Sequence, residues 1–341
     1  MEHKLILQEF ERYKLEYLAF GHQTDYKTHA SASSVFNELC SITHFHSLKT
    51  EAKQVFLLTP SVFNSPNILS IGHPHDIITN LRNFGEVYLI EWLEIKNPNV
   101  NLNDYALAVT DVLKFISLKH QQKIDLVGHC LGANLAIAAS ILKQNLVSSI
   151  ILMSIPWDFS YLKGAKAIYS KLNFGHTIGA LDQVPALYFQ LLFFLMQPES
   201  FKQKIDYYHD QRDKLDKEAF FAIEHWQFSG HDLPRALYNQ LMEDLIGSNA
   251  MLKKQWVLKD QIIDLALITK PVMMVIGTKD KIVPTHSSRP LCDIIPNITL
   301  FEYNTGHIGY LVGSQREHFM LDLHEWINKI GTNERSLYYA C

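Results

Sequence analysis

Cysteine is scarce in this 341-residue chain, which has four, and no two of them have the spacing of a zinc-binding or redox CxxC motif. So few cysteines in so long a chain argue against a disulfide framework and indicate a reducing compartment. The N-terminus lacks the apolar core of a signal peptide, and the longest apolar run, Ala186–Met196, is too short to cross a bilayer. A net charge of -4 gives no reason to expect a nucleic-acid partner. We therefore expect a cytoplasmic globular protein.

The chain also lacks internal repeats and low-complexity tracts, and strand patterns alternate with helix patterns along it. Short apolar runs predict buried strands at 54–62, 86–92, 123–129, 148–155, 271–277 and 298–303. Apolar residues at helical spacing predict a helix over 103–118 with Asn103 as its N-cap, and a final helix ending at Gly331. This alternation predicts an α/β protein with a mostly parallel sheet and helices on both faces.

Between Trp157 and Ile262 the strand pattern stops, and the composition becomes aromatic and helical. We therefore predict a helical cap at 157–262, inserted into an α/β core formed by 51–156 and 263–341. Residues 1–50 are predicted to form an N-terminal helical segment that packs on the main body. This is the layout of an α/β-hydrolase fold with an inserted helical cap.

The pentapeptide GHCLG (128–132) follows a predicted strand and precedes an alanine-rich helix, which is the form of a nucleophile elbow. Such a tight turn needs small residues two positions either side of the nucleophile, here Cys130. The N-terminus of the following helix stabilises a thiolate, and the backbone N–H of Leu131 would face a developing oxyanion. The alternative is a buried cysteine in a tight turn.

A nucleophile of this kind needs a base and an acid that orients the base. Asp280 and His307 follow the two last predicted strands, in the order that this fold requires and at the carboxyl ends where α/β folds place their sites. The second oxyanion donor is expected in the loop after the strand at 54–62, from Val62 or Phe63.

The segment GHPHD (72–76) is the one local cluster of potential metal ligands. Its proline and the lack of a second cluster favour a solvated loop over a metal site. No metal and no cofactor are expected.

Several segments together resemble the polyhydroxyalkanoate synthases, specifically the catalytic subunit of the two-subunit class III enzymes. The matching segments are PSVFNSPNIL (60–69), GEVYLIEW (85–92), GHCLGA (128–133), EHWQFSG (224–230), GSNAMLKKQW (247–256), DKIVPTHSS (280–288) and GHIGYLVG (306–313). The resemblance covers roughly residues 50 to 330. The chain departs from the family at His129, where an aromatic residue is more frequent, and at Ala133, which replaces a second glycine.

The resemblance implies an acyltransferase that polymerises (R)-3-hydroxyacyl-CoA, with 3-hydroxybutyryl-CoA as the expected substrate, and releases CoA. Cys130 would carry the acyl group, His307 would activate it, and Asp280 would contact His307. Cysteine suits this chemistry, because a thioester keeps the acyl group activated until a chain hydroxyl arrives. The resemblance also implies a polyester chain or granule surface as partner, and an accessory synthase subunit, a homodimer or both.

Two other classes of protein remain open. A cysteine-dependent thioesterase or an intracellular polyester depolymerase would use the same three residues with water as acceptor. A non-catalytic granule-associated scaffold would need none of them, so the joint presence of Cys130, Asp280 and His307 argues against it.

Overall fold

The computed structural model describes residues 12–19, 30–72, 74–163, 180–196, 198–211, 213–214 and 216–337. The strands of its central sheet are β1 (Ala32–Val35), β2 (Cys40–Phe45), β3 (Gln54–Thr59), β4 (Gly85–Trp92), β5 (Ile124–His129), β6 (Val147–Met153), β11 (Val272–Gly277) and β12 (Ile298–Tyr303). They lie in the order β1-β2-β4-β3-β5-β6-β11-β12. β1 and β2 pair antiparallel, as do β2 and β4, and the strands from β4 to β12 are parallel to their neighbours.

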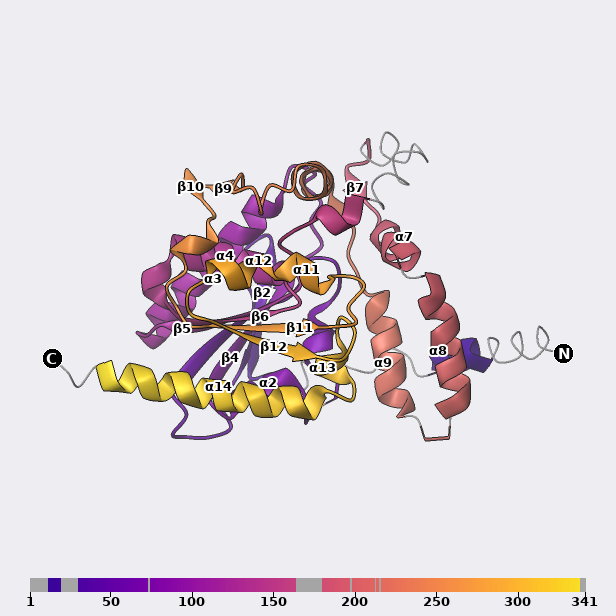
Figure 1. Cartoon of the computed structure of the whole chain (residues 1–341), viewed down its shortest axis with the longest axis horizontal. Helices are drawn as coiled ribbons and strands as arrows, with labels where there is room; N and C mark the ends of the chain where they lie inside the picture. The colour runs from indigo at the N-terminus through magenta and orange to yellow at the C-terminus, as the bar shows by residue number, and fades with distance from the viewer. Residues whose placement is uncertain are drawn as a thin grey trace.

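Helices cover both faces of this sheet. They are α2 (Ile77–Arg82), α3 (Leu102–His120), α4 (Leu131–Leu142), α11 (Thr285–Ser288), α12 (Pro290–Ile294), α13 (Gly309–Val312) and α14 (Arg316–Leu337), with 3-10 turns η2 (Pro66–Leu69), η3 (Gln144–Leu146) and η6 (Leu265–Leu267). In Figure 1, α3, α4 and α12 lie on one side of the sheet, and α2 and α14 lie on the other.

The sheet separates two hydrophobic cores, because successive side chains of a strand point to opposite faces. On β3, Val55 and Leu57 belong to the core under α3 and α4, whereas Phe56 and Leu58 belong to the core under α2 and α14. β5 and β11 are buried along their full length, as a parallel sheet covered on both faces requires. The predicted fold class is therefore confirmed.

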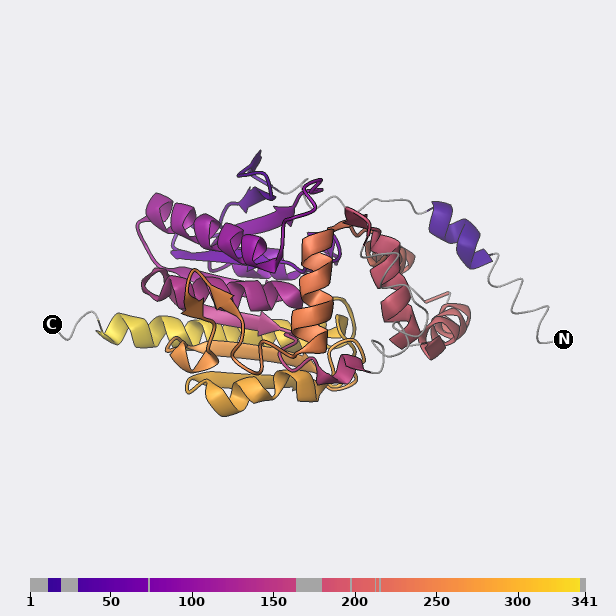
Figure 2. The ribbon, with the colours of Figure 1, turned by 90° about the horizontal axis from the view of Figure 1, so that it is seen from above.

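Between β6 and β11 the chain leaves the central sheet. It forms η4 (Ser160–Leu162), α7 (Ala186–Met196), α8 (Pro198–Gln211), α9 (Lys217–Gln227), α10 (Arg235–Gln240) and η5 (Leu241–Gly247). The two-residue strands β7 (Gln183–Val184), β8 (Leu233–Pro234), β9 (Val257–Leu258) and β10 (Gln261–Ile262) form two small sheets of their own. Figures 1 and 2 show α7, α8 and α9 beyond the carboxyl ends of β11 and β12. The excursion from Met153 to Val272 is wider than the predicted cap at 157–262.

The N-terminal region differs from the predicted helical segment at 1–50. Residues 12–19 are helical, but β1 and β2 are strands of the central sheet. Apolar and polar residues alternate over Cys40–Thr43 in β2, a strand pattern that the predicted helical segment overlooked, and β2 pairs with β4 along its full length. The helical residues pack on α9 instead of the main body: the Tyr13 hydroxyl donates to Glu224, and His225 Nε2 lies 2.9 Å from the Tyr17 carbonyl oxygen.

Two predicted helix ends are also wrong. The N-cap of α3 is Asn101, whose side chain accepts the Asn103 N–H, while the Asp104 carboxylate accepts the Asn101 N–H at 2.8 Å. This reciprocal pair of bonds fixes the start of the helix two residues before the predicted position. At the other end of the chain, α14 continues past Gly331 to Leu337, because one glycine costs a helix only about 1 kcal/mol.

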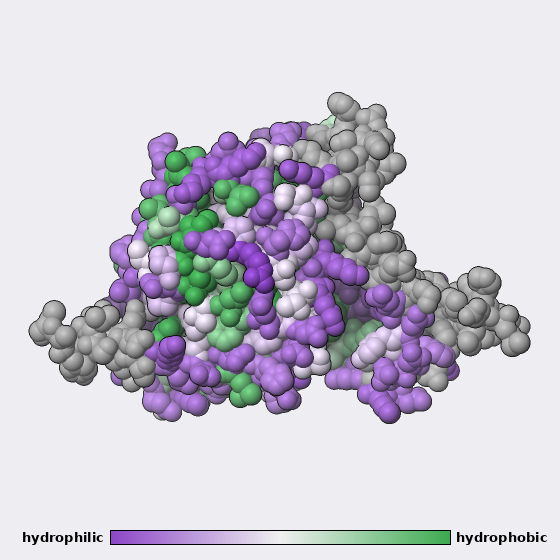
Figure 3. All heavy atoms as spheres, viewed as in Figure 1, coloured by the Kyte–Doolittle hydropathy of each residue, from purple (hydrophilic) through white to green (hydrophobic). Residues whose placement is uncertain are grey.

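Within the described part of the chain, no helix combines the length and the hydrophobicity needed to cross a membrane. The face shown in Figure 3 is mostly hydrophilic, with apolar side chains gathered over β9, β10 and η6. Val257, Ile262 and Leu267 are the exposed large apolar residues of these elements.

Candidate active site

The elbow places Cys130 between β5 and α4 in a conformation that few L-residues adopt. Its φ is 54° and its ψ is -129°. A Cβ atom added to Gly132 would lie 2.2 Å from the Thr59 carbonyl oxygen, and one added to Gly128 would lie 2.3 Å from the Cα of Ala133. These are backbone atoms that cannot move aside. The turn therefore requires glycine at both positions, as the sequence pattern predicts.

Asp280 and His307 meet at the same end of the sheet. His307 Nδ1 lies 2.6 Å from Asp280 Oδ2, and both side chains are buried. The other oxygen of Asp280 accepts the backbone N–H groups of Ile282 and Val283 at 2.8 and 2.9 Å. These two bonds fix the carboxylate, which in turn orients the imidazole with its Nε2 directed away from Asp280.

The electrostatics of the site favour a charged imidazole. Burial alone would lower the pKa of His307, but the negative charges of Asp280 and Cys130, with their hydrogen bonds to the ring, outweigh it and raise that pKa to about 10. His307 thus interacts with both Asp280 and Cys130. The structure brings the three residues singled out from the sequence together at one end of the sheet.

Ser154, which the sequence analysis missed, supports the histidine loop. It follows β6, and its hydroxyl lies 2.8 Å from the Tyr310 hydroxyl and 3.1 Å from the His307 carbonyl oxygen. Its backbone has a φ of 48°, and its N–H donates to the Val275 carbonyl at 2.9 Å. A lone serine after a strand carries no recognisable motif, so sequence reasoning had no signal for it.

His129, next to the nucleophile, lies beside the His307 ring. Its ring centroid is 5.4 Å from that of His307, and the residue is only 2% exposed. Burial, and secondarily the charge of His307, hold the pKa of His129 well below its usual range. Its Nε2 has no hydrogen-bond partner among the described residues. His129 is therefore a neutral neighbour of the reacting groups.

Tyr161 is a second residue that sequence reasoning did not single out, and it comes from η4 at the start of the excursion. Burial raises its pKa well above the usual range, and the negative charges of Cys130 and Asp280 add to this effect. Its ring makes an edge contact with His286, with centroids 5.9 Å apart. The phenol thus stays protonated beside the thiol and the carboxylate.

The loop predicted to supply the second oxyanion donor lies against the first turn of α4. Pro60 accepts the indole N–H of Trp92 at 3.1 Å and is in close contact with Gly132. Val62 is buried in the same core as Leu131. Phe63 packs against Phe189 and Phe193 of α7, with centroids 5.0 and 5.6 Å apart, so the excursion helices close over this loop.

In the segment GHPHD, His73 lies outside the described residues, and the other two potential ligands do not converge. Asp76 is the N-cap of α2: its Oδ1 accepts the Thr79 N–H at 2.8 Å. His75 is exposed. The carboxylate of Asp76 therefore caps helix α2.

Comparison with known proteins identifies the family. A family model described as "alpha/beta hydrolase fold" matches residues 77–314. The chain therefore belongs to the alpha/beta hydrolase fold family. Among solved structures, BpoC from Mycobacterium tuberculosis H37Rv has a TM-score of 0.54 at 14% identity, covering 89% of this chain and 99% of that one. MenH from S. aureus has a TM-score of 0.52 at 15% identity, covering 85% and 98%.

Curated relatives within this family carry a more specific name. The "Poly(3-hydroxyalkanoate) polymerase subunit PhaC" of Haloarcula marismortui is 26% identical over 297 residues, covering 82% of this chain and 62% of that protein. The protein of the same name from Haloferax mediterranei is 26% identical over 80% of this chain and 58% of its own length. The chain thus spans about three fifths of these two relatives. For the PhaC of Allochromatium vinosum, the identity is 26% and both coverages are 82%.

Proposed function

We propose that the chain is the catalytic subunit of a polyhydroxyalkanoate synthase, which transfers 3-hydroxyacyl groups from CoA to a growing polyester. The observation that carries the proposal is a cysteine at the elbow beside a histidine fixed by Asp280, in a chain whose curated relatives are named polymerase subunits. A thiolate exchanges one thioester for another at almost no cost in free energy, which suits transfer from CoA.

In the first half-reaction, the Cys130 thiolate attacks the thioester carbonyl of the substrate. The carbon–sulfur bond to CoA then breaks, and the proton on His307 passes to the departing CoA sulfur. The raised pKa of His307 supports this step, because the imidazolium is already present when the leaving group needs a proton. The acyl group remains on Cys130 as a thioester.

In the second half-reaction, neutral His307 takes the proton from a hydroxyl group of the polyester chain. The resulting oxygen attacks the acyl-enzyme carbonyl, an ester bond forms, and the bond to the Cys130 sulfur breaks. The proton stays on His307, so the thiolate and the imidazolium are restored together. The reaction uses no cofactor beyond the CoA thioester that is its substrate.

Both tetrahedral intermediates carry a negative oxygen that needs backbone donors. The Leu131 N–H at the start of α4 is the first donor that we propose. For the second, we favour the Val62 N–H, because the Phe63 N–H already donates to the Ser61 hydroxyl at 3.4 Å.

Water competes with the chain hydroxyl for the acyl-enzyme, so the site must exclude it during transfer. We infer that the excursion between β6 and β11 acts as a cap with this role. Two contacts support the inference: α7 packs on Phe63, and Asn64 donates to the carbonyls of Trp226 and Gln227 at the end of α9.

The relatives are named as subunits of a polymerase. We infer that this chain likewise works with an accessory subunit, in a homodimer, or both, and acts in the cytoplasm at the surface of its polymer granules. Adding a candidate accessory subunit should then increase the rate of CoA release. An unchanged rate at saturating subunit would contradict the dependence on that partner.

The experiment that tests the function mixes the purified chain with 3-hydroxybutyryl-CoA and follows both CoA release and product mass. Cys130→Ala serves as the inactive control. CoA release with ester-linked oligomers, lost in the variant, is the expected result. CoA release with free 3-hydroxybutyrate alone would identify a thioesterase and overturn the proposal. Absence of release with every partner tested would favour a scaffold.

A further inference from the structure

Two histidines and a glutamate come together at the edge of the sheet opposite the elbow. His44 lies in β2, His46 follows the end of β2, and Glu86 lies near the start of β4. In the antiparallel pairing Phe45 faces Val87, so the next residue along, His46, comes opposite Glu86. The spacing of two along a strand directs both histidines to the same face.

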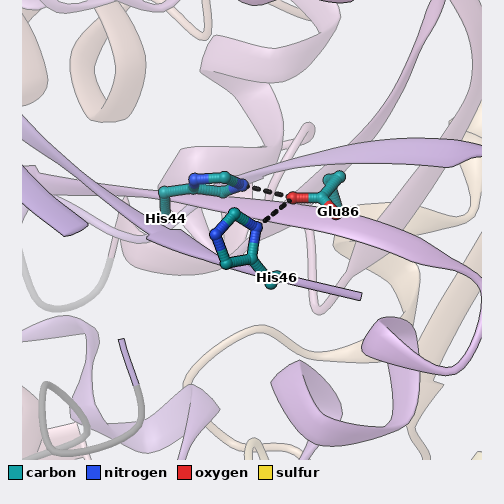
Figure 4. A group of neighbouring side chains, drawn as sticks. All are labelled: His44, His46 and Glu86. Carbon is teal, nitrogen blue, oxygen red and sulfur yellow. Dashed lines mark hydrogen bonds and ion pairs between the residues drawn. The ribbon is translucent and has the colours of Figure 1, made fainter. Parts of the chain in front are cut away.

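The three side chains converge on one carboxylate oxygen. His44 Nε2 lies 2.5 Å from Glu86 Oε2, and His46 Nδ1 lies 3.0 Å from the same atom. Figure 4 shows both rings turned toward the carboxylate. The three potential ligand atoms all lie within 4.8 Å of one another.

Neighbouring groups hold these side chains in place. The Ser47 N–H donates to Glu86 Oε1 at 3.1 Å, which leaves Oε2 for the two histidines. The His44 ring stacks on Tyr88 with centroids 4.2 Å apart and planes 2° from parallel. The Tyr88 hydroxyl lies 2.7 Å from His120 Nε2. Such outer contacts fix the orientation of a ligand before a metal binds.

We propose that His44, His46 and Glu86 bind one divalent transition-metal ion, with Zn²⁺ as the best fit and a water completing a tetrahedral shell. Tetrahedral zinc with bonds of about 2.1 Å needs ligand atoms about 3.4 Å apart. The observed distances of 2.5 and 3.0 Å therefore have to lengthen by less than about 1 Å. The His46 side chain is 67% exposed, which gives it room to move and gives the ion and the water a route in.

The ion would fasten β2 to β4 at the end of the sheet away from Cys130, so its role is structural. The sequence-based expectation of no metal site overlooked these residues because His46 and Glu86 are separated by 40 positions. Only the strand pairing brings them together.

The test uses the full-length chain after treatment with a chelator, titrated with zinc chloride by calorimetry. We expect one zinc per chain in the wild type, and a rise in melting temperature of about 3 °C or more at zinc 100-fold above its Kd. His46→Ala and Glu86→Gln should each weaken binding at least tenfold. His318→Ala, which removes an exposed histidine on α14, is the matched control and should bind as the wild type does.

No stoichiometric zinc binding by the wild type would overturn the proposal, as would equal binding by His46→Ala and the wild type. Because His46 is largely exposed, its truncation should leave the fold intact. The zinc affinity of Glu86→Gln is an independent second measurement. Neither measurement uses the acyltransferase activity, so the outcome does not depend on the proposed function.

Discussion

Replacing Asp280 by asparagine should remove the main charge that keeps a proton on His307. The rise in the pKa of His307 from 6.5 to about 10 is worth about 5 kcal/mol, at about 1.4 kcal/mol per pH unit. Asp280 is the largest favourable contribution to that rise. If Asp280 supplies about 3 kcal/mol of this, the variant shifts the proton equilibrium from the thiolate–imidazolium pair toward the neutral pair by that amount, and acylation by the thiolate slows by up to roughly 100-fold.

The assay is rapid-quench release of CoA from 3-hydroxybutyryl-CoA during the first turnover, measured across a range of pH. We expect the roughly 100-fold loss at neutral pH. The rate of CoA release should decrease at alkaline pH, and in the variant this decrease should come at a lower pH, because His307 without Asp280 loses its proton more easily. In the wild type this fall should come as the pH approaches about 10.

Asp293→Asn removes an exposed carboxylate on α12 and is the control for the change of net charge. It should leave both the rate and the pH profile as in the wild type. An Asp280→Asn enzyme that releases CoA at the wild-type rate, with its alkaline fall unmoved, would refute the reasoning about the imidazolium.

Three further predictions concern the residues around the elbow. Gly132→Ala places a Cβ 2.2 Å from the Thr59 carbonyl oxygen and should lower the free energy of unfolding by about 2–4 kcal/mol in urea, whereas Gly306→Ala, which meets nothing within 4 Å, should not. His129→Phe removes a buried nitrogen that has no partner among the described residues, so the melting temperature should hold or rise. A clear fall in its melting temperature would show that the nitrogen is satisfied in solution. Ser154→Ala loses the bonds to Tyr310 and the His307 carbonyl, and first-turnover CoA release should fall about tenfold with a loss of about 1 kcal/mol in stability.

The sheet, and the meeting of Cys130, Asp280 and His307 at one end of it, could be predicted because the signals are local. Continuous apolar runs mark buried parallel strands such as β3 and β11. The tight turn around Cys130 requires glycine at two positions, because a Cβ at Gly128 or Gly132 would clash with neighbouring backbone atoms. This requirement is visible in the sequence. Asp280 and His307 each follow a strand, so the topology alone brings them to one edge.

What the sequence could not supply depends on distant contacts. The place of β2 in the sheet comes from its pairing with β4, and the alternation over Cys40–Thr43 is too short to predict that place. Ser154 matters through its bond to the His307 carbonyl, and His46 meets Glu86 only across the sheet. The Asn101 cap was missed because its partner Asp104 makes it a better helix start than the neighbouring Asn103. In each case the deciding partner is visible only once the chain is folded or the local turn is formed.

The most direct test of the central claim is intact-protein mass spectrometry after brief mixing with 3-hydroxybutyryl-CoA, followed by mapping of the modified peptide. We expect an adduct heavier than the free protein by one hydroxybutyryl unit, on the peptide that contains Cys130. The adduct should be labile to hydroxylamine, as a thioester is, and absent from Cys130→Ala. Adducts on another residue, or CoA release with Cys130 unmodified at every time point, would contradict it.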